Sequence, residues 1–167
     1  MACEISSGHE LLLTECVMSN IFEGLSADHI IGLLSCFCVD EKTEDSGLLD
    51  PELQKSFTKC QEIAKSMAET MAECKIPIEV DKFVEILKPQ LVDPVIRWMA
   101  GDKFGDIIST LDMFEGNIVR VIRRLEELVR EMATAANAIG NDELFKKLVE
   151  GRSRLRRGII FSASLYL

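Results

Sequence analysis

Apolar residues recur at helical spacing along almost the whole chain, and the alternating runs that a β-sheet needs do not occur. The spacing predicts helices over residues 9–19, 27–38, 51–75, 82–87, 94–98, 103–111, 115–139 and from 142 to near the C-terminus. No segment between them has the length or composition of a linker between domains. The pattern therefore predicts one all-α domain, a helical bundle of about seven or eight helices with one long central helix.

Capping residues mark several of these predicted boundaries. Ser26, Asp50 and Asp102 stand where an N-cap side chain would accept a backbone N–H from the first turn. Gly140 is typical of a helix C-cap and Asn141 of the N-cap of the next helix. Together they predict a tight turn between the last two helices, which should form an antiparallel hairpin.

The predicted helix over residues 115–139 has two different faces when successive residues are placed about 100° apart. The apolar arc consists of Ile118, Val121, Ile122, Leu125, Leu128, Val129 and Met132. The opposite arc consists of Arg120, Arg123, Arg124, Glu127, Arg130 and Glu131. One arc should pack on a core, and the other should meet either solvent or an anion.

Three further segments have an apolar side that we expect to be buried. The helix over 51–75 carries Phe57, Cys60, Ile63, Ala64, Met67, Met71 and Cys74. In the last helix Leu144, Leu148, Leu155 and Ile159 should face inward, with Lys147, Arg152, Arg154, Arg156 and Arg157 mostly outward. The terminal residues Ile159, Ile160, Phe161, Leu165, Tyr166 and Leu167 are too apolar for an exposed tail and should close the bundle.

Charge is distributed unevenly along the chain. The total is −9, from 19 Lys and Arg against 28 Asp and Glu. Residues 101–167 hold 11 basic and 10 acidic side chains, which leaves 19 − 11 = 8 against 28 − 10 = 18 in the first hundred residues. The acidic total argues against a freestanding nucleic-acid binder, and any contact with an anion should lie in the C-terminal third.

The sequence contains none of the motifs from which enzyme chemistry is usually inferred. It lacks both the G-x-x-x-x-G-K-[ST] phosphate loop and G-x-G-x-x-G. His9 and His29 do not stand at a zinc-ligand spacing from any pair of cysteines, and the cysteines are typical of buried, reduced thiols. We therefore expect no catalytic residue, no metal ligand and no cofactor in this domain, and no enzymatic activity of the chain by itself.

Composition leaves more than one interpretation of the arginine-rich arc. An ion-paired, solvated face is the more ordinary one, because Arg120, Arg123 and Arg130 lie within reach of Glu127. The alternative is a surface for a partner or a nucleic acid. The segment 102–129 has the outline of a helix-turn-helix, but a DNA regulator should be basic, and this chain is not.

A co-linear set of motifs resembles a known family. The set comprises residues 114–120, 123–128, 138–141 and 158–167, with 12–15, 32–37, Trp98, Gly101 and Phe104 upstream. It is similar to the C-terminal helical domain, called DSHCT, of superkiller-type and mRNA-transport-type DExH-box RNA helicases linked to the exosome. The resemblance covers residues 8–167 and leaves 1–7 as a lead-in that need not be native. Gly158, Ser162 and Asn117 depart from the aspartate, alanine and serine or threonine usual in that family.

The resemblance implies that the long helix is the "ratchet" helix, which faces single-stranded RNA during 3'-5' unwinding in RNA decay or processing. Matched by position, the RNA-binding candidates are Arg120, Arg123, Arg124 and Glu127. The chain would be a fragment of an ATP-dependent helicase whose other domains bind ATP and Mg. The competing hypothesis is a helical protein–protein interaction module without nucleic-acid contact.

The same resemblance implies the surroundings of the domain. Its partners would be single-stranded RNA, the RecA-like and winged-helix domains of the parent helicase, and proteins of the exosome-cofactor complex. A membrane is not expected, because no apolar run approaches the ~20 residues of a spanning helix. We expect an intracellular protein, nuclear in preference to cytoplasmic.

Overall fold

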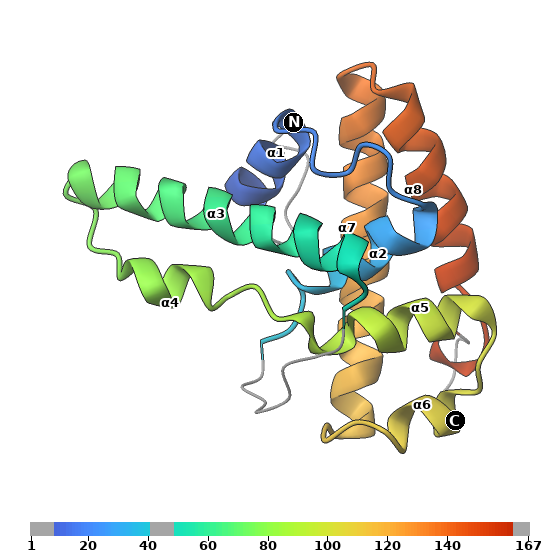
Figure 1. Ribbon diagram of the computed structural model, residues 1–167. Coiled ribbons are helices and arrows are strands. Elements are labelled where there is room, and N and C mark those ends of the chain that lie inside the picture. The colour runs from blue at the N-terminus through green and yellow to red at the C-terminus, as the bar shows by residue number, and fades with distance from the viewer. Residues whose placement is uncertain (1–8, 41–48, 162–167) are drawn as a thin grey trace.

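The computed structural model describes residues 9–40 and 49–161, and this part of the chain is helical, without a strand (Figure 1). The elements are α1 (Glu10–Met18), α2 (Ala27–Ser35), α3 (Pro51–Glu73), α4 (Val80–Val84), η2 (Pro89–Leu91), α5 (Val92–Ala100), α6 (Phe104–Ile108), α7 (Glu115–Ala138), α8 (Asp142–Leu155) and η3 (Ile159–Phe161). The prediction of an all-α helical bundle is confirmed. Among the described helices, none combines the length and the apolar character that crossing a membrane requires.

The innermost helix is α2, which α3, α5, α7 and α8 surround. Its buried residues are Ala27, Ile30, Ile31, Gly32, Leu33, Leu34 and Ser35. Helix α8 packs against it at Gly151, where a β-carbon would lie 2.5 Å from the Ile31 side chain. Glycine at this position therefore allows the two helices to pack in direct contact.

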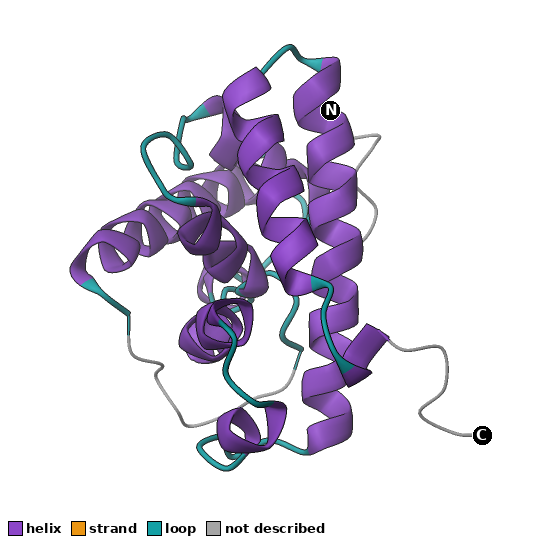
Figure 2. Cartoon of the chain, turned by 90° about the vertical axis from the view of Figure 1, so that its right-hand side faces the viewer, coloured by secondary structure: helices purple, strands orange, loops and turns teal. Residues whose placement is uncertain are grey.

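Helices α7 and α8 lie side by side as an antiparallel hairpin (Figures 1 and 2). The turn follows the sequence prediction, since Gly140 has a φ of 76° and the Asn141 side chain accepts the Leu144 N–H at 3.1 Å. The predicted apolar arc of α7 is buried at all seven positions, from Ile118 to Met132. The hairpin thus forms one wall of the core.

Two expectations about this hairpin are wrong. Glu131, assigned to the polar arc, is only 7% exposed. Helix α8 ends at Leu155 instead of continuing toward the terminus. Trp98 covers the end of the helix, because its indole N–H donates to the Leu155 carbonyl at 2.9 Å and the Arg157 guanidinium lies 4.1 Å from the centre of its ring.

The C-terminal segment returns to α7 as η3. Within it Ile160 is fully buried and Phe161 is half-buried, which confirms the predicted apolar closure for these two residues. The side chain of Ile159 and the whole of Leu165, Tyr166 and Leu167 lie outside the described residues.

Helix α3 projects from the body, and α4 folds back along its outer half (Figure 1). Its buried residues are Leu53, Phe57, Cys60, Ala64 and Ala68. Ile63, Met67 and Met71 are only half-buried, and Cys74, predicted on the apolar stripe, is exposed. We call residues 62–84, which comprise the outer half of α3, the turn and α4, the α3–α4 arm.

Of the three N-caps predicted at Ser26, Asp50 and Asp102, the first two are correct and the third is wrong. The Ser26 hydroxyl accepts the His29 N–H at 3.2 Å, and the Asp50 carboxylate accepts the N–H groups of Glu52 and Leu53. Asp102 does not cap a helix. Its carboxylate instead accepts the Arg97 Nε–H at 2.9 Å, and α6 begins two residues later and spans only five residues.

Candidate nucleic-acid interface

The four RNA-binding candidates from the sequence lie on one side of α7. Arg120 and Arg123 are exposed, whereas Arg124 and Glu127 are half-buried. At about 100° per residue the four side chains fall within roughly a quarter to a third of the helix circumference. They share a face but have three kinds of neighbour. Arg120 and Arg124 line one hollow, Arg123 contacts the C-terminal segment, and Glu127 pairs with Arg130.

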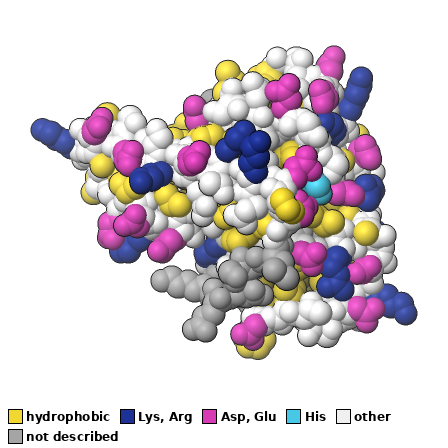
Figure 3. Space-filling view, viewed as in Figure 1, with side chains coloured by type: hydrophobic (Ala, Val, Ile, Leu, Met, Phe, Trp, Pro, Cys, Tyr) yellow, Lys and Arg dark blue, Asp and Glu magenta, His cyan; other side chains and the backbone are white. Residues whose placement is uncertain are grey.

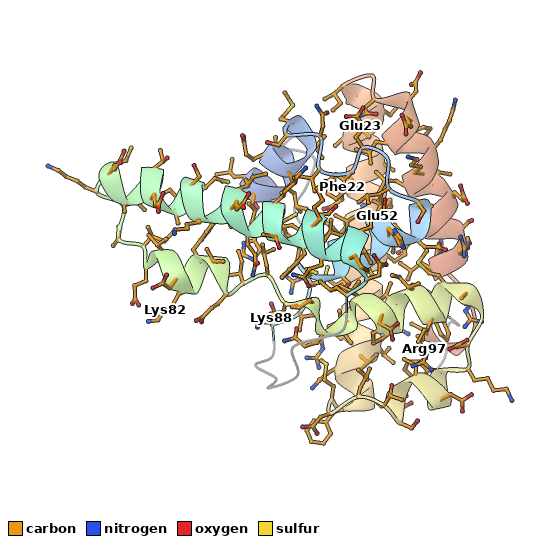
Figure 4. The ribbon with its side chains drawn as sticks, viewed as in Figure 1. Phe22, Glu23, Glu52, Lys82, Lys88 and Arg97 are labelled. Atoms are coloured by element: carbon orange, nitrogen blue, oxygen red, sulfur yellow. The ribbon has the colours of Figure 1, made fainter. Side chains whose placement is uncertain are left out.

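Arg124 meets the carboxylate of Asp40, with its terminal nitrogen 2.6 Å from Asp40 Oδ2. Asp40 follows the end of α2 and is itself held by Lys88, whose Nζ donates to the Asp40 carbonyl at 2.8 Å. The Lys88 backbone N–H also bonds the Cys36 carbonyl, so the linker before α5 fixes this loop (Figure 4). The position of the carboxylate beside Arg124 is therefore set by three separate segments of the chain.

Arg120 and Arg124 line the same small hollow, of about 50 Å³, between α7 and the end of α2. Its other lining residues are Cys38, Asp40, Met113, Asn117 and Val121. Burial raises the pKa of the Cys38 thiol to about 12, although the Arg124 charge opposes the shift, so this wall is neutral at pH 7. The hollow combines guanidinium donors, a carboxylate, an amide and apolar side chains.

Arg123 points to a different neighbour. Its Nε–H donates to the Ile160 carbonyl at 2.9 Å and so ties η3 to α7. Arg123 therefore has a structural contact that the sequence did not indicate, because its partner lies 37 residues away.

Glu127 pairs with Arg130, one turn further along α7. The Arg130 Nε–H donates to Glu127 Oε2 at 3.0 Å, and a second guanidinium nitrogen contacts Oε1. The hydrogen bond from Arg130 lowers the pKa of the Glu127 carboxyl, and the same bond raises the pKa of Arg130. This pair confirms one of the ion pairs that the sequence allowed.

One face of the molecule carries surface charge of both signs. On the face shown in Figure 3, Lys and Arg side chains are interspersed with Asp and Glu and do not gather into one basic patch. Among the residues that the structure describes, no group of three His, Cys, Asp or Glu could hold a metal ion. The polar face of α7, with its four arginines, is the feature to which the sequence assigns an anion contact.

Asp40 is the site residue that the sequence did not reveal. It lies 84 residues before Arg124 in the chain, within a polar and acidic stretch that the pattern predicts only as a loop. No local periodicity could have paired the two side chains, since their approach depends on how α2 crosses α7.

Comparison with known proteins gives the family. The DSHCT (NUC185) domain model matches residues 1–162. The human exosome RNA helicase MTR4 is 45% identical over 167 residues, which cover 100% of this chain and 16% of that protein. The Arabidopsis thaliana DExH-box ATP-dependent RNA helicase DExH9 is 40% identical over 100% of this chain and 17% of its own length.

The fission yeast Schizosaccharomyces pombe ATP-dependent RNA helicase mtr4 is 39% identical over 168 residues, with 100% of this chain and 15% of that protein covered. The chain thus spans about a sixth of the length of these relatives. The family model matches almost the whole chain, the relatives are 39–45% identical to it, and the chain belongs to the DSHCT domain family.

Proposed function

We propose that this chain is the C-terminal accessory domain of an ATP-dependent RNA helicase of the exosome-cofactor type. In this proposal the polar face of α7 contacts single-stranded RNA during 3'-5' unwinding in RNA decay or processing. The observation that carries the proposal is the position of Arg120 and Arg124 beside one hollow on a helix whose opposite face is fully packed. The family match and the printed names of the relatives support it.

Arg120 and Arg124 are the residues to which we assign RNA contact. A guanidinium can donate several hydrogen bonds to a base edge or a phosphate, or stack on a base. We assign Arg123 a positioning role, because it ties η3 to α7. Glu127 would then set the position of Arg130 and add a carboxylate acceptor at the edge of the face.

The domain should contribute to RNA binding without dominating it. The chain carries a net charge of −9, and two carboxylates, Asp40 and Glu127, stand among the arginines of the face. Most phosphate contacts would therefore come from the RecA-like and winged-helix domains, which would also bind ATP and Mg. We further propose an intracellular and mainly nuclear site of action, with exosome-cofactor proteins as partners.

The first test uses the 167-residue chain and a fluorescent oligouridylate at low salt. Arg124→Ala should weaken binding by at least about tenfold, because a hydrogen bond to a charged group contributes about 1.5–3 kcal/mol and every 1.4 kcal/mol is a factor of ten. Asp40→Asn should strengthen binding by about two- to threefold, since it removes a carboxylate that competes for Arg124. Lys65→Ala, at an exposed position on α3, is the control and should leave affinity unchanged.

The second test uses the parent helicase. Arg124→Ala should reduce the rate of RNA unwinding far more than basal ATP hydrolysis, which would reside in other domains. If alanine at Arg120, Arg124 and Glu127 left both RNA binding and unwinding unchanged, the face would be an ordinary ion-paired surface. The domain would then be better described as a protein–protein interaction module.

A further inference from the structure

A second concave surface lies between the C-terminal half of α7 and α8, and its volume is about 470 Å³. We call it the α7–α8 groove. Its apolar floor consists of Ala133, Phe145 and Val149. Val149 is 45% exposed, although its neighbours on α8, Leu144 and Leu148, are buried. The hairpin therefore leaves an aliphatic side chain on its surface inside a groove.

Three arginines surround this floor, Arg130 from α7 and Arg152 and Arg156 from α8. Among the residues that the structure describes, no carboxylate lines the groove, but Glu126 and Glu127 of α7 pair with its arginines. Glu127 pairs with Arg130, and the Arg152 Nε–H donates to Glu126 Oε1 at 2.7 Å. Besides Glu127, Glu131 also lies close enough to Arg130 to raise its pKa, so three carboxylates of α7 balance the three arginines in charge, although none of the three lines the groove.

Glu126 of α7 contacts two of these arginines, Arg152 and Arg156. Its side chain is 14% exposed, and the same Oε1 atom lies 2.7 Å from Arg152 and 3.7 Å from Arg156 Nε. A half-buried carboxylate that faces two guanidinium groups fixes their position and neutralises only one of them. Each guanidinium carries five N–H donors, so both retain donors for a further acceptor.

We propose that the α7–α8 groove binds an acidic peptide segment that carries bulky apolar side chains, as in the docking of an amphipathic helix into a groove. The arginines complement its carboxylates, and Val149 and Phe145 receive its apolar side chains. This combination of arginine and apolar side chains at the centre of a concave surface is typical of protein interfaces. The proposal does not depend on RNA binding by Arg120 and Arg124.

Two features favour a peptide over RNA as the occupant. Base recognition without sequence preference uses exposed aromatic rings, and Phe145, the one aromatic residue among the described residues of the groove, is half-buried. The groove also lies on the opposite flank of the α7 polar face from the hollow beside Arg124. At 100° per residue, Arg130 and Arg124 lie about 120° apart around the helix.

The test uses the 167-residue chain and two synthetic amphipathic peptides of about 14 residues, or four helical turns. Both carry leucines at i, i+3, i+4 and i+7, and the remaining positions are mainly Glu in one peptide and Lys in the other. Fluorescence anisotropy should show the Glu peptide binding at least about tenfold more tightly than the Lys peptide, with a difference that falls as salt is added.

Variants then place the binding on the molecule. Arg156→Gln should lower the affinity for the Glu peptide at least about threefold, and Val149→Asp should abolish detectable binding of that peptide. Lys59→Gln is the matched control, because it removes one positive charge at an exposed position on α3 and should have no effect. Arg124→Ala should also leave the Glu peptide unaffected, which separates this proposal from the proposed RNA contact.

The proposal is overturned if neither peptide binds, if both bind equally, or if Arg156→Gln behaves like Lys59→Gln. It is also overturned if oligouridylate displaces the Glu peptide and its own affinity falls with Arg156→Gln. That result would assign the groove to nucleic acid.

Discussion

Helices α3 and α7 are nearly equal in length, with 23 and 24 residues, but they differ in how much of each is buried. Five residues of α3 are buried, and none of them lies beyond Ala68. Eleven residues of α7 are buried, and they extend from Ile118 to Ala136. Both sequences are amphipathic, so the difference reflects the partners that each helix meets. Helix α7 meets α2, α8 and η3, whereas the outer half of α3 meets α4.

This difference has a functional consequence. The polar side chains of α7 project from a backbone that is packed along most of its length, so the backbone positions of Arg120, Arg124 and Arg130 are held in a fixed spacing. A face of this kind suits a site that must hold a defined geometry. The α3–α4 arm has fewer buried contacts, and it should open locally at a lower free energy than the body.

The largest effect should come from a cavity in α7. Leu125 is fully buried, and Leu125→Ala should lower the free energy of unfolding by about 2–5 kcal/mol. Met71→Ala in the arm removes a half-buried side chain and should lower the free energy of unfolding by at most about 1 kcal/mol. Urea denaturation followed by circular dichroism measures both. Equal losses would mean that the arm is as tightly packed as α7.

A smaller effect is expected where α8 crosses α2. Alanine normally stabilises a helix by about 1 kcal/mol relative to glycine. In Gly151→Ala, however, the new β-carbon would lie 2.5 Å from Ile31 and should destabilise the protein by about 1–3 kcal/mol. Gly116→Ala on α7 is the matched control, since its β-carbon would meet nothing within 4 Å. Thermal denaturation should show a lower Tm for Gly151→Ala and an unchanged or higher Tm for Gly116→Ala.

The sequence predicted most of the fold because the signals involved are local. Apolar periodicity placed the buried arc of α7, and the side chains of Ser26, Asp50 and Asn141 marked helix starts. The burial of Glu131 was missed, because it depends on how neighbouring helices approach its flank of α7. In the candidate site the contacts of Arg123 with Ile160 and of Arg124 with Asp40 depend on long-range packing, which periodicity does not encode.

The next prediction concerns the arm itself. Phe83 of α4 is half-buried against the core cluster, and Phe83→Ala should cost about 1–2 kcal/mol, less than the 3–5 kcal/mol typical of a fully buried phenylalanine. Hydrogen exchange should accelerate in the outer half of α3 and in α4, with little change in α7 and α8. An equal acceleration in α7 would show that the arm and the body unfold as one unit.

The last prediction uses the cysteines to compare local opening of the α3–α4 arm with opening of the body. Cys74 is exposed at the end of the arm, whereas Cys16, Cys36, Cys38 and Cys60 are buried. Burial raises the pKa of the Cys36 thiol. The pKa of the Cys16 thiol is raised mainly by its hydrogen bond with Cys60 and, to a smaller extent, by burial. These sulfurs therefore remain protonated and unreactive at neutral pH. In a Cys3→Ser variant, one thiol per chain should therefore react rapidly with iodoacetamide.

Mass spectrometry of the digested protein should assign this rapid reaction to Cys74. The buried thiols should react only as fast as the domain opens, and low urea should accelerate Cys60 of α3 before Cys36 and Cys38, which lie beside α2. That order follows if opening begins on the arm side, because Cys60 is the last α3 cysteine before the helix leaves the body. Simultaneous labelling of Cys60 and Cys38 at every urea concentration would contradict it and would indicate that the domain opens only by global unfolding.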